Sequence, residues 1–209
     1  MTWRAPSGLY AIVDPEHCAG RDPRAVAEAI LHGGCAALQL RSKVGGDGER
    51  LALARALRAL CHAHGVPFVM NDRPDLARLA DADGLHLGQD DLALVDARRI
   101  VGTMPIGRST HSLEQALRAV EEGACLLGFG PVFPTQSKVL ASPVVGLSRL
   151  SEVARAVSLP IVAIGGIDAA RATDVRHAGA HHGAAIRALC AAPFPEEAAR
   201  VMHAALRSA

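Results

Sequence analysis

Short apolar runs and amphipathic stretches alternate eight times along this chain. The apolar runs predict strands over residues 8–13, 35–40, 67–70, 84–87, 105–108, 125–129, 160–164 and 183–186. After each of them, apolar residues at helical spacing predict helices over residues 22–33, 49–64, 74–80, 92–101, 112–122, 147–157, 169–178 and 195–206. Because the apolar runs are short and do not alternate with polar residues, they indicate strands buried on both faces of a parallel sheet. Eight such units predict an α/β fold, a single (β/α)8 TIM barrel over residues 1–209, with an open doubly wound sheet as the alternative.

Composition limits the partners of such a protein. Lys and Arg number 22 and Asp and Glu number 21, and this balance argues against binding nucleic acid or an anionic membrane through bulk charge. Six aromatic residues are too few for a base-stacking surface. The apolar runs are too short to cross a bilayer, and no secretory signal is expected at the N-terminus. The five scattered cysteines fit a reducing cytoplasm.

A barrel of this kind carries its chemistry where the strands end. Polar side chains follow most of the predicted strands here, and a glycine pair follows the strand at 160–164. The residues concerned are Gln39, Arg41, Lys43, Asn71, Asp72, Gln89, Asp90, Asp91, Ser109, His111, Thr135, Ser137, Lys138, Gly165, Gly166 and Arg187. We therefore expect them to meet at the C-terminal mouth of the barrel.

Gln39, Arg41 and Lys43 occupy positions i, i+2 and i+4, so their side chains share one side of an extended segment. Neighbouring cations repel one another, and an anion bound between them offsets this repulsion. The Arg fork and the Lys point charge both suit phosphate oxygens. The alternative is a strand end that turns into solvent.

Acidic residues follow the two adjacent strands at 67–70 and 84–87. They are Asp72, which follows Asn71, and the pair Asp90 and Asp91. Carboxylates on a rigid rim beside a phosphate site indicate Mg²⁺ that bridges a diphosphate. A turn with helix caps, or a surface salt-bridge cluster, is the alternative.

Two further segments suit a phosphate. Gly165 and Gly166 open a helix, where backbone N–H groups and the positive end of the helix favour an anion, although a glycine pair is also a plain turn signal. The segment from Thr135 to Lys138 supplies hydroxyls and an ammonium group. The uncharged stretch 139–145 has no helical period and predicts a loop over the site.

These motifs together resemble the thiamine phosphate synthase family. The resemblance runs from about residue 8 to residue 206 and rests on the segments 8–14, 39–43, 71–72, 82–91, 107–111, 130–138 and 160–167. The most specific part is Gly-Leu-His-Leu-Gly-Gln at 84–89 combined with Gly-Pro-Val-Phe-Pro-Thr at 130–135.

The resemblance implies a barrel enzyme in which a thiazole phosphate displaces pyrophosphate from hydroxymethylpyrimidine diphosphate. By position, the pyrimidine diphosphate would be bound by Gln39, Arg41, Lys43, Asn71, Ser109 and Lys138. Mg²⁺ would be bound by Asp72 and Asp91. The thiazole phosphate would be bound by Thr135, Ser137, Gly166, Ile186 and Arg187. The family is expected to react by ionisation to a pyrimidine methyl cation, so that Arg41, Lys43 and Lys138 act catalytically by neutralising the departing anion.

The chain departs from the family pattern at several positions. Ser137 stands in place of Thr, Ser42 lies within the Gln-Leu-Arg-x-Lys motif, and Val139-Leu140 replaces a more charged stretch. The largest departure is at 179–187, where His181-His182 replaces Asp-Gly and Arg187 replaces Ser. Arg187 either strengthens phosphate binding or fills the pocket.

Two alternatives follow from these departures. Gly-Arg-Ser-Thr-His-Ser at 107–112 also resembles the sister thiazole tautomerases, which would use an acid or base such as His111 and need no Mg²⁺. The altered segment at 179–187 leaves open a paralogue that binds a phosphorylated metabolite without catalysis. A homo-oligomer is compatible with the resemblance.

Overall fold

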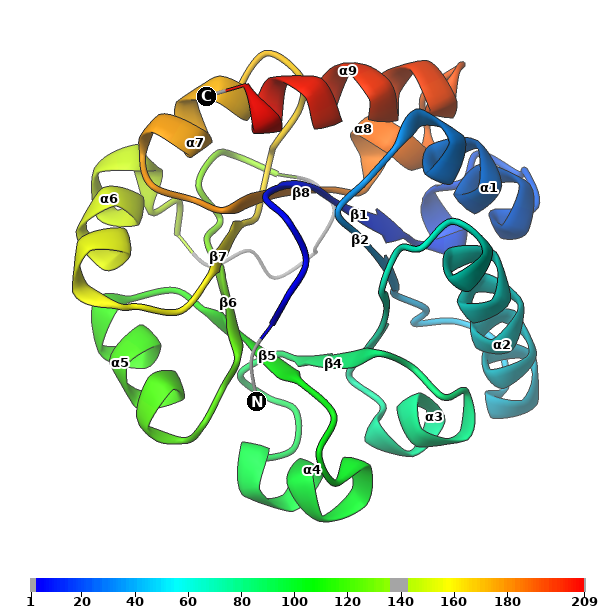
Figure 1. Ribbon diagram of the computed structural model, residues 1–209, viewed down its shortest axis with the longest axis horizontal. Coiled ribbons are helices and arrows are strands. Elements are labelled where there is room, and N and C mark those ends of the chain that lie inside the picture. The colour runs from blue at the N-terminus through cyan, green and yellow to red at the C-terminus, as the bar shows by residue number, and fades with distance from the viewer. Residues whose placement is uncertain (1–2, 136–142, 209) are drawn as a thin grey trace.

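Eight parallel strands close into a barrel in the order β1 to β8. The computed structural model describes residues 3–135 and 143–208. The strands are β1 Gly8–Val13, β2 Ala37–Leu40, β3 Phe68–Asn71, β4 Gly84–Leu87, β5 Ile106–Thr110, β6 Leu126–Phe129, β7 Ile161–Ala163 and β8 His182–Ala185. The barrel closes where β1 pairs with β8, in the register Gly8 to His182 (Figure 1). The predicted (β/α)8 barrel is confirmed, and the open sheet is wrong.

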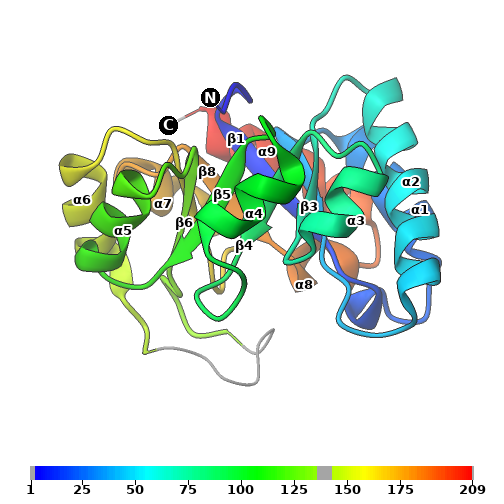
Figure 2. The ribbon, with the colours of Figure 1, turned by 90° about the horizontal axis from the view of Figure 1, so that it is seen from below.

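The helices surround this barrel (Figures 1 and 2). They are α1 Pro23–Gly33, α2 Asp47–Ala63, α3 Pro74–Leu79, α4 Leu94–Val101, α5 Leu113–Glu121, α6 Gly146–Ala156, α7 Ala172–His177, α8 Arg187–Cys190 and α9 Pro195–Arg207, with a 3₁₀ turn, η1, at Pro15–His17. Figure 2 shows the start of β1 and the end of α9 at one end of the barrel and α8 at the other. No helix of the described chain is long and apolar enough to span a bilayer.

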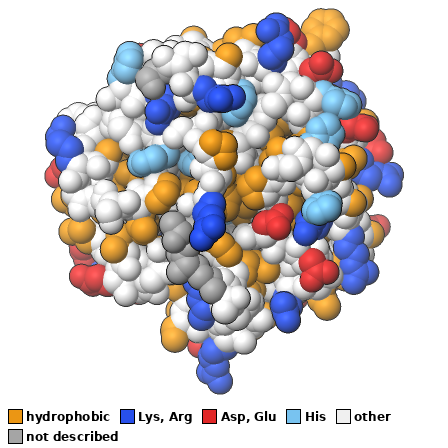
Figure 3. Space-filling view, in the orientation of Figure 1, with side chains coloured by type: hydrophobic (Ala, Val, Ile, Leu, Met, Phe, Trp, Pro, Cys, Tyr) orange, Lys and Arg blue, Asp and Glu red, His pale blue; other side chains and the backbone are white. Residues whose placement is uncertain are grey.

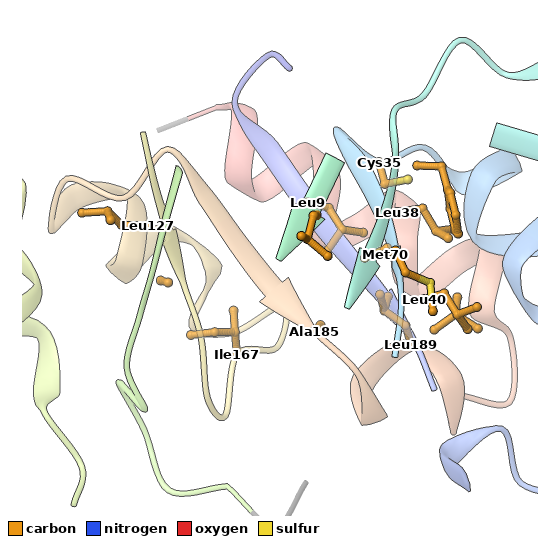
Figure 4. Packing of buried hydrophobic residues seen from close by; sticks show 14 of the residues in the cluster. Leu9, Cys35, Leu38, Leu40, Met70, Leu127, Ile167, Ala185 and Leu189 are labelled. Atoms are coloured by element: carbon orange, nitrogen blue, oxygen red, sulfur yellow. The ribbon is translucent and has the colours of Figure 1, made fainter. Parts of the chain in front are cut away.

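Apolar side chains fill two separate regions. The larger lies between the strands and the surrounding helices, where Leu9, Leu38, Leu40 and Met70 pack (Figure 4). The smaller fills the inside of the barrel and consists of Trp3, Tyr10, Ala37, Val69, Leu126, Val162 and Ala184. Because β1, β2, β3, β6, β7 and β8 place residues in both regions, both of their faces are buried, and this explains the uniformly apolar runs in the sequence.

The chain before β1 covers the amino-terminal end of the barrel (Figure 1). The Trp3 indole N–H donates to Nε2 of His182 at 3.2 Å, and the Trp3 ring lies 6.3 Å from that of Tyr10. Charged side chains of both signs are spread over this face, near its middle as well as at its edge (Figure 3). The amino-terminal end is therefore filled, and the mouth at the carboxyl ends of the strands is where a ligand can enter.

Two elements were not predicted from the sequence, and several bounds differ. The helix α8 and the turn η1 are each four residues or fewer, too short for a helical period to register. The helix α7 begins at Ala172 and not at 169, because the Asp168 carboxylate accepts the Arg171 N–H in a turn that precedes it. The strand β5 continues to Thr110, whose hydroxyl donates to the Gly128 carbonyl at 3.0 Å.

Candidate active site at the mouth of the barrel

A cavity of about 1260 Å³ opens at the carboxyl ends of the strands. Every predicted site residue within the described chain lines it. These residues are Gln39, Arg41, Lys43, Asn71, Asp72, Asp91, Ser109, Thr135, Gly166, Ile186 and Arg187. Ser137 and Lys138 lie outside the described residues. Segments up to 148 positions apart in sequence, from Gln39 to Arg187, therefore share one cavity.

Gln39 lies in β2, next to its last residue, and its side chain lines the cavity. Its amide Nε2 donates to the Tyr10 hydroxyl at 2.9 Å, and both side chains are buried. Burial raises the pKa of Tyr10, so the phenol stays protonated and keeps its O–H as a donor. Sequence analysis missed Tyr10, which lies within an apolar run. The available indication was its hydroxyl, a polar group within an apolar strand, on the side that faces the inside of the barrel.

Arg41 follows β2 and forms an ion pair with the carboxylate of Asp14, which follows β1. Asp14 is fully buried, and its other oxygen accepts the Glu16 N–H at 3.1 Å. The Nδ1 atom of His17 lies 3.4 Å from the same carboxylate. Asp14 therefore fixes the direction of the Arg41 guanidinium, which leaves the other face of its fork for a ligand.

Lys43 forms an ion pair with Asp72, which follows β3. The sequence predicted that Arg41 and Lys43 lie side by side and bind an anion. In the structure, each of them already forms an ion pair with a carboxylate that follows an adjacent strand. This difference arises because parallel strand ends converge on one rim and bring opposite charges together. The expected phosphate site and the expected metal site therefore share the Lys43–Asp72 pair.

Asp72 and Asp91 follow the adjacent strands β3 and β4, and both line the cavity. Burial, and then the neighbouring Asp72 carboxyl group, raises the pKa of Asp91 above its ordinary value. Asp72 takes a left-handed backbone, with φ of 64°, and its N–H donates to the His86 carbonyl at 2.8 Å. Neither residue caps a helix, because the caps of α3 and α4 are Arg73 and Ala93. The helix-cap alternative is therefore wrong.

These two carboxylates fit a magnesium ion. The described residues bring no group of three or more His, Cys, Asp or Glu together, so protein ligands for a cation there come from this pair. Mg²⁺ commonly takes one or two carboxylates and completes its shell with water and substrate phosphates. The positive charge of such an ion would also favour the ionised form of Asp91, which burial and the neighbouring Asp72 disfavour.

His86 on β4 forms the floor of the cavity with Ser109 on β5. The His86 Nε2 and the Ser109 hydroxyl are 2.9 Å apart. The ring has room because the neighbouring strands carry glycine: a Cβ on Gly107 would lie 2.7 Å from His86 Nδ1, and one on Gly128 would lie 3.1 Å from Cε1. Sequence analysis placed Ser109 in the site but missed His86. A histidine inside an otherwise apolar strand was the signal available.

The turn Gly165–Gly166 follows β7 and faces the segment after β6. Both glycines have positive φ, 88° and 67°. A Cβ on Gly165 would lie 2.5 Å from Cβ of Pro131, and one on Gly166 would lie 2.5 Å from the Pro134 carbonyl oxygen. Glycine is therefore required by packing as well as by backbone conformation.

The unusual segment 179–187 divides between the two ends of the barrel. His182 begins β8 at the amino-terminal end, beside Trp3, and Nδ1 of His181 accepts the Ile161 N–H at 3.2 Å. Burial lowers the pKa of His182 to about 4. Arg187 begins α8 and lines the cavity at the mouth. The histidine pair therefore lies away from the cavity, and only Arg187 alters it.

Arg108 lies on β5 with its side chain buried outside the cavity. Its guanidinium donates to the Leu92 carbonyl at 3.0 Å and to the Gln89 carbonyl at 3.4 Å. Both acceptors belong to the loop that carries Asp91. Within the motif at 107–112 that also resembles the tautomerases, Arg108 thus supports the loop that carries Asp91, whereas Ser109 and His111 line the cavity.

Comparison with known proteins agrees with this geometry. The family model described as thiamine monophosphate synthase matches residues 9–189. The chain is 44% identical over 204 residues to the thiamine-phosphate synthase of Chloroflexus aurantiacus, covering 98% of this chain and 93% of that protein. It is 46% identical to that of Anaeromyxobacter dehalogenans, covering 96% and 88%.

Among solved structures, the thiamine phosphate pyrophosphorylase from Pyrococcus furiosus superposes with a TM-score of 0.88. The two share 33% identity, and the match covers 95% of each chain. A geranylgeranylglyceryl phosphate synthase from Thermoplasma acidophilum superposes with a TM-score of 0.70 at 15% identity, which shows a shared fold alone.

Proposed function

This chain belongs to the thiamine monophosphate synthase family and is a transferase, and on that premise we propose that its barrel mouth joins hydroxymethylpyrimidine diphosphate to a thiazole phosphate. The products are thiamine phosphate and pyrophosphate. The observation that supports this proposal is one cavity lined by two groups of residues suited to bind anions. Arg41, Lys43 and the carboxylate pair line one side, and Gly166 with Arg187 lines another.

The pyrimidine diphosphate occupies the side formed by β2 to β5. Gln39, whose amide is fixed by Tyr10, and Ser109, which contacts His86, bind the pyrimidine ring from the floor. Arg41, Lys43 and Asn71 bind the diphosphate at the rim, together with Lys138. In this arrangement the carboxylates Asp14 and Asp72 keep the two rim cations extended toward the ligand.

Asp72 and Asp91 would hold Mg²⁺ at the diphosphate. The ion, when bound, supplies charge neutralisation to the departing pyrophosphate and so lowers the cost of its release. The Arg108 contacts to the Gln89 and Leu92 carbonyls support the loop of Asp91 from behind.

The reaction exchanges one carbon–oxygen bond for one carbon–nitrogen bond. The bond from the pyrimidine methylene carbon to the diphosphate oxygen breaks, and its electron pair leaves with pyrophosphate. The thiazole nitrogen lone pair then forms the new bond to the methylene cation. Arg41, Lys43 and Lys138 stabilise charge that grows on the leaving group, so their contribution is largest in the transition state. No covalent bond to the protein is needed.

The thiazole phosphate occupies the corner formed by the turn after β7 and the start of α8. Gly166 supplies a backbone N–H group there, and Ile186 and Arg187 supply the wall and a cation. The hydroxyls of Thr135 and Ser137 add hydrogen bonds. Replacement of the family's Ser by Arg187 strengthens phosphate binding in this proposal. The five cysteines are buried thiols, which fits work in the cytoplasm.

The decisive experiment is an assay of thiamine phosphate from both substrates with Mg²⁺, run beside a sample containing EDTA. We expect product only with Mg²⁺ and a fall in kcat/KM of at least about 100-fold in Asp72→Ala and in Asp91→Ala. Asp96→Ala, an exposed carboxylate in the first turn of α4, is the matched control and should retain full activity. Full activity of the cavity variants, or full activity in EDTA, would overturn the metal assignment.

A further inference from the structure

Arg171 lines the cavity on the side of the thiazole phosphate, and sequence analysis did not single it out. It lies between β7 and α7, after the Gly165–Gly166 turn. Its guanidinium Nη1 donates to the Gly166 carbonyl at 2.6 Å. The guanidinium carbon also lies 4.8 Å from the centre of the Phe133 ring, in the segment after β6. One side chain therefore contacts two loops that follow different strands.

These two loops meet without spare space. The positions of Gly165 and Gly166 have no room for a Cβ because Pro131, Phe133 and Pro134 occupy it. Close packing on one side and the Arg171 side chain on the other hold the turn in place. A planar guanidinium that stacks on an aromatic ring while it donates a hydrogen bond is well suited to this, and an ammonium is not.

The turn that Arg171 contacts presents unused donors. In residues 3–135 and 143–208, the N–H groups of Gly166 and Ile167 donate to no protein acceptor, and both residues line the cavity. The C=O and N–H of one trans peptide point in opposite directions. A hydrogen bond to the Gly166 carbonyl therefore also sets the direction of the Ile167 N–H.

The carboxylate of Asp168 would repel an anion bound at this turn. Asp168 lines the cavity, and its Oδ2 lies 3.8 Å from Nη1 of Arg171. Arg171 thus offsets the charge of Asp168 as well as contacting the turn. Loss of Arg171 leaves this carboxylate facing a phosphate dianion.

We propose that Arg171 is a positioning residue for the phosphate of the thiazole substrate, acting through the Gly166–Ile167 peptide and its stack on Phe133. The inference rests on the proposed function, because it assigns this turn to the thiazole phosphate. It predicts an effect on one substrate and not on the other.

The test measures steady-state kinetics of Arg171→Gln with each substrate varied in turn. We expect KM for the thiazole phosphate to rise by about tenfold, the size expected for one lost charge-assisted hydrogen bond. We expect kcat, KM for the pyrimidine diphosphate and Tm to stay close to those of the parent protein. Arg155→Gln, an exposed arginine of α6, is the matched control and should change none of these.

Two further variants separate positioning from charge. Arg171→Lys keeps the charge but loses the planar stack, so most of the rise in KM should remain. Phe133→Leu should give a smaller rise, and the double variant Phe133→Leu with Arg171→Gln should be no worse than Arg171→Gln alone, because the two residues act as one unit. Full recovery with Lys, or multiplied effects in the double variant, overturns the inference.

The failure of this inference and that of the proposed function are distinguishable. A parent protein that makes product while Arg171→Gln shows unchanged or equally raised KM values overturns the inference alone. A parent protein that makes no thiamine phosphate overturns the proposed function. In that case, titration of both proteins with inorganic phosphate by calorimetry still tests Arg171: weaker binding to the variant supports its role, and equal binding overturns it.

Discussion

At the scale of single residues, the cavity is built from oppositely charged pairs that join adjacent strands. Arg41 pairs with Asp14, and Lys43 pairs with Asp72. Each pair fixes a long, flexible side chain that would otherwise lose conformational freedom when a ligand binds. In the proposed function, the carboxylates of Asp14 and Asp72 are therefore as much a part of the anion site as Arg41 and Lys43 are.

Asp14 provides the first residue-level prediction. In Asp14→Asn the Arg41 guanidinium loses its charged partner and its fixed direction, so we expect KM for the pyrimidine diphosphate to rise by about tenfold, with a smaller change for the thiazole phosphate. Steady-state kinetics with each substrate varied will measure this. The control is Glu197→Gln, which breaks an exposed Glu–Arg pair on α9. Equal effects of the two substitutions would contradict the role of Asp14.

At the scale of elements, β8 and the chain before β1 cooperate to fill the amino-terminal end of the barrel. His182 is 1% exposed there and accepts the Trp3 N–H. Its pKa falls from 6.5 to about 4 because burial disfavours the charged ring. The unfolded chain therefore binds this proton more readily than the folded chain, so the stability that depends on neutral His182 is present above about pH 6.5 and is lost as the pH falls toward 4.

This direction of the pH dependence of stability can be measured by urea unfolding. Between about pH 7.5 and pH 5, His182 should account for a loss of about 2 kcal/mol in the free energy of unfolding. His182→Gln should make stability less dependent on pH in this window, whereas His177→Gln, at an exposed position on α7, should leave the dependence unchanged. The same pH dependence of the free energy of unfolding in the parent protein and in His182→Gln would contradict this prediction.

Elements also show where the sequence was sufficient. Strand and helix positions were predictable because the eightfold alternation of apolar runs and helical periods is a local pattern, which can be recognised in the sequence without any tertiary contact. The short helix α8 was not, because four residues carry no period. Tyr10 and His86 were hidden because an apolar strand gives no sign of which of its faces points into the barrel.

At the scale of the whole molecule, residues from or after most strands of the barrel line the mouth, so a ligand bound there should stabilise the whole barrel. In the proposed function, pyrophosphate would interact with the rim cations Arg41 and Lys43, and Mg²⁺ would interact with Asp72 and Asp91, so each ligand would balance the charge of the other. At a ligand concentration about 100 times Kd the gain is about 2.7 kcal/mol. For a chain of this size that is a rise in Tm of about 5 to 10 °C.

Thermal unfolding with each ligand alone and with both tests this coupling. We expect the rise with both to exceed the sum of the separate rises, and we expect Asp91→Asn to remove this excess while the variant alone is no less stable than the parent. The last point follows because burial and Asp72 already disfavour the charged form of Asp91. Simple additivity in the parent protein would argue against a shared site.

The sequence by itself determined the barrel and placed the residues that follow its strands at the mouth, because the carboxyl ends of parallel strands lie at the same end of the barrel. Only the tertiary structure decided which of those residues touch. The Asp14–Arg41 and Lys43–Asp72 pairs, the contact of Arg171 with Phe133, and the separation of His182 from Arg187 depend on strand register and on the direction of each side chain. Those are set by packing between residues far apart in sequence, which no local pattern records.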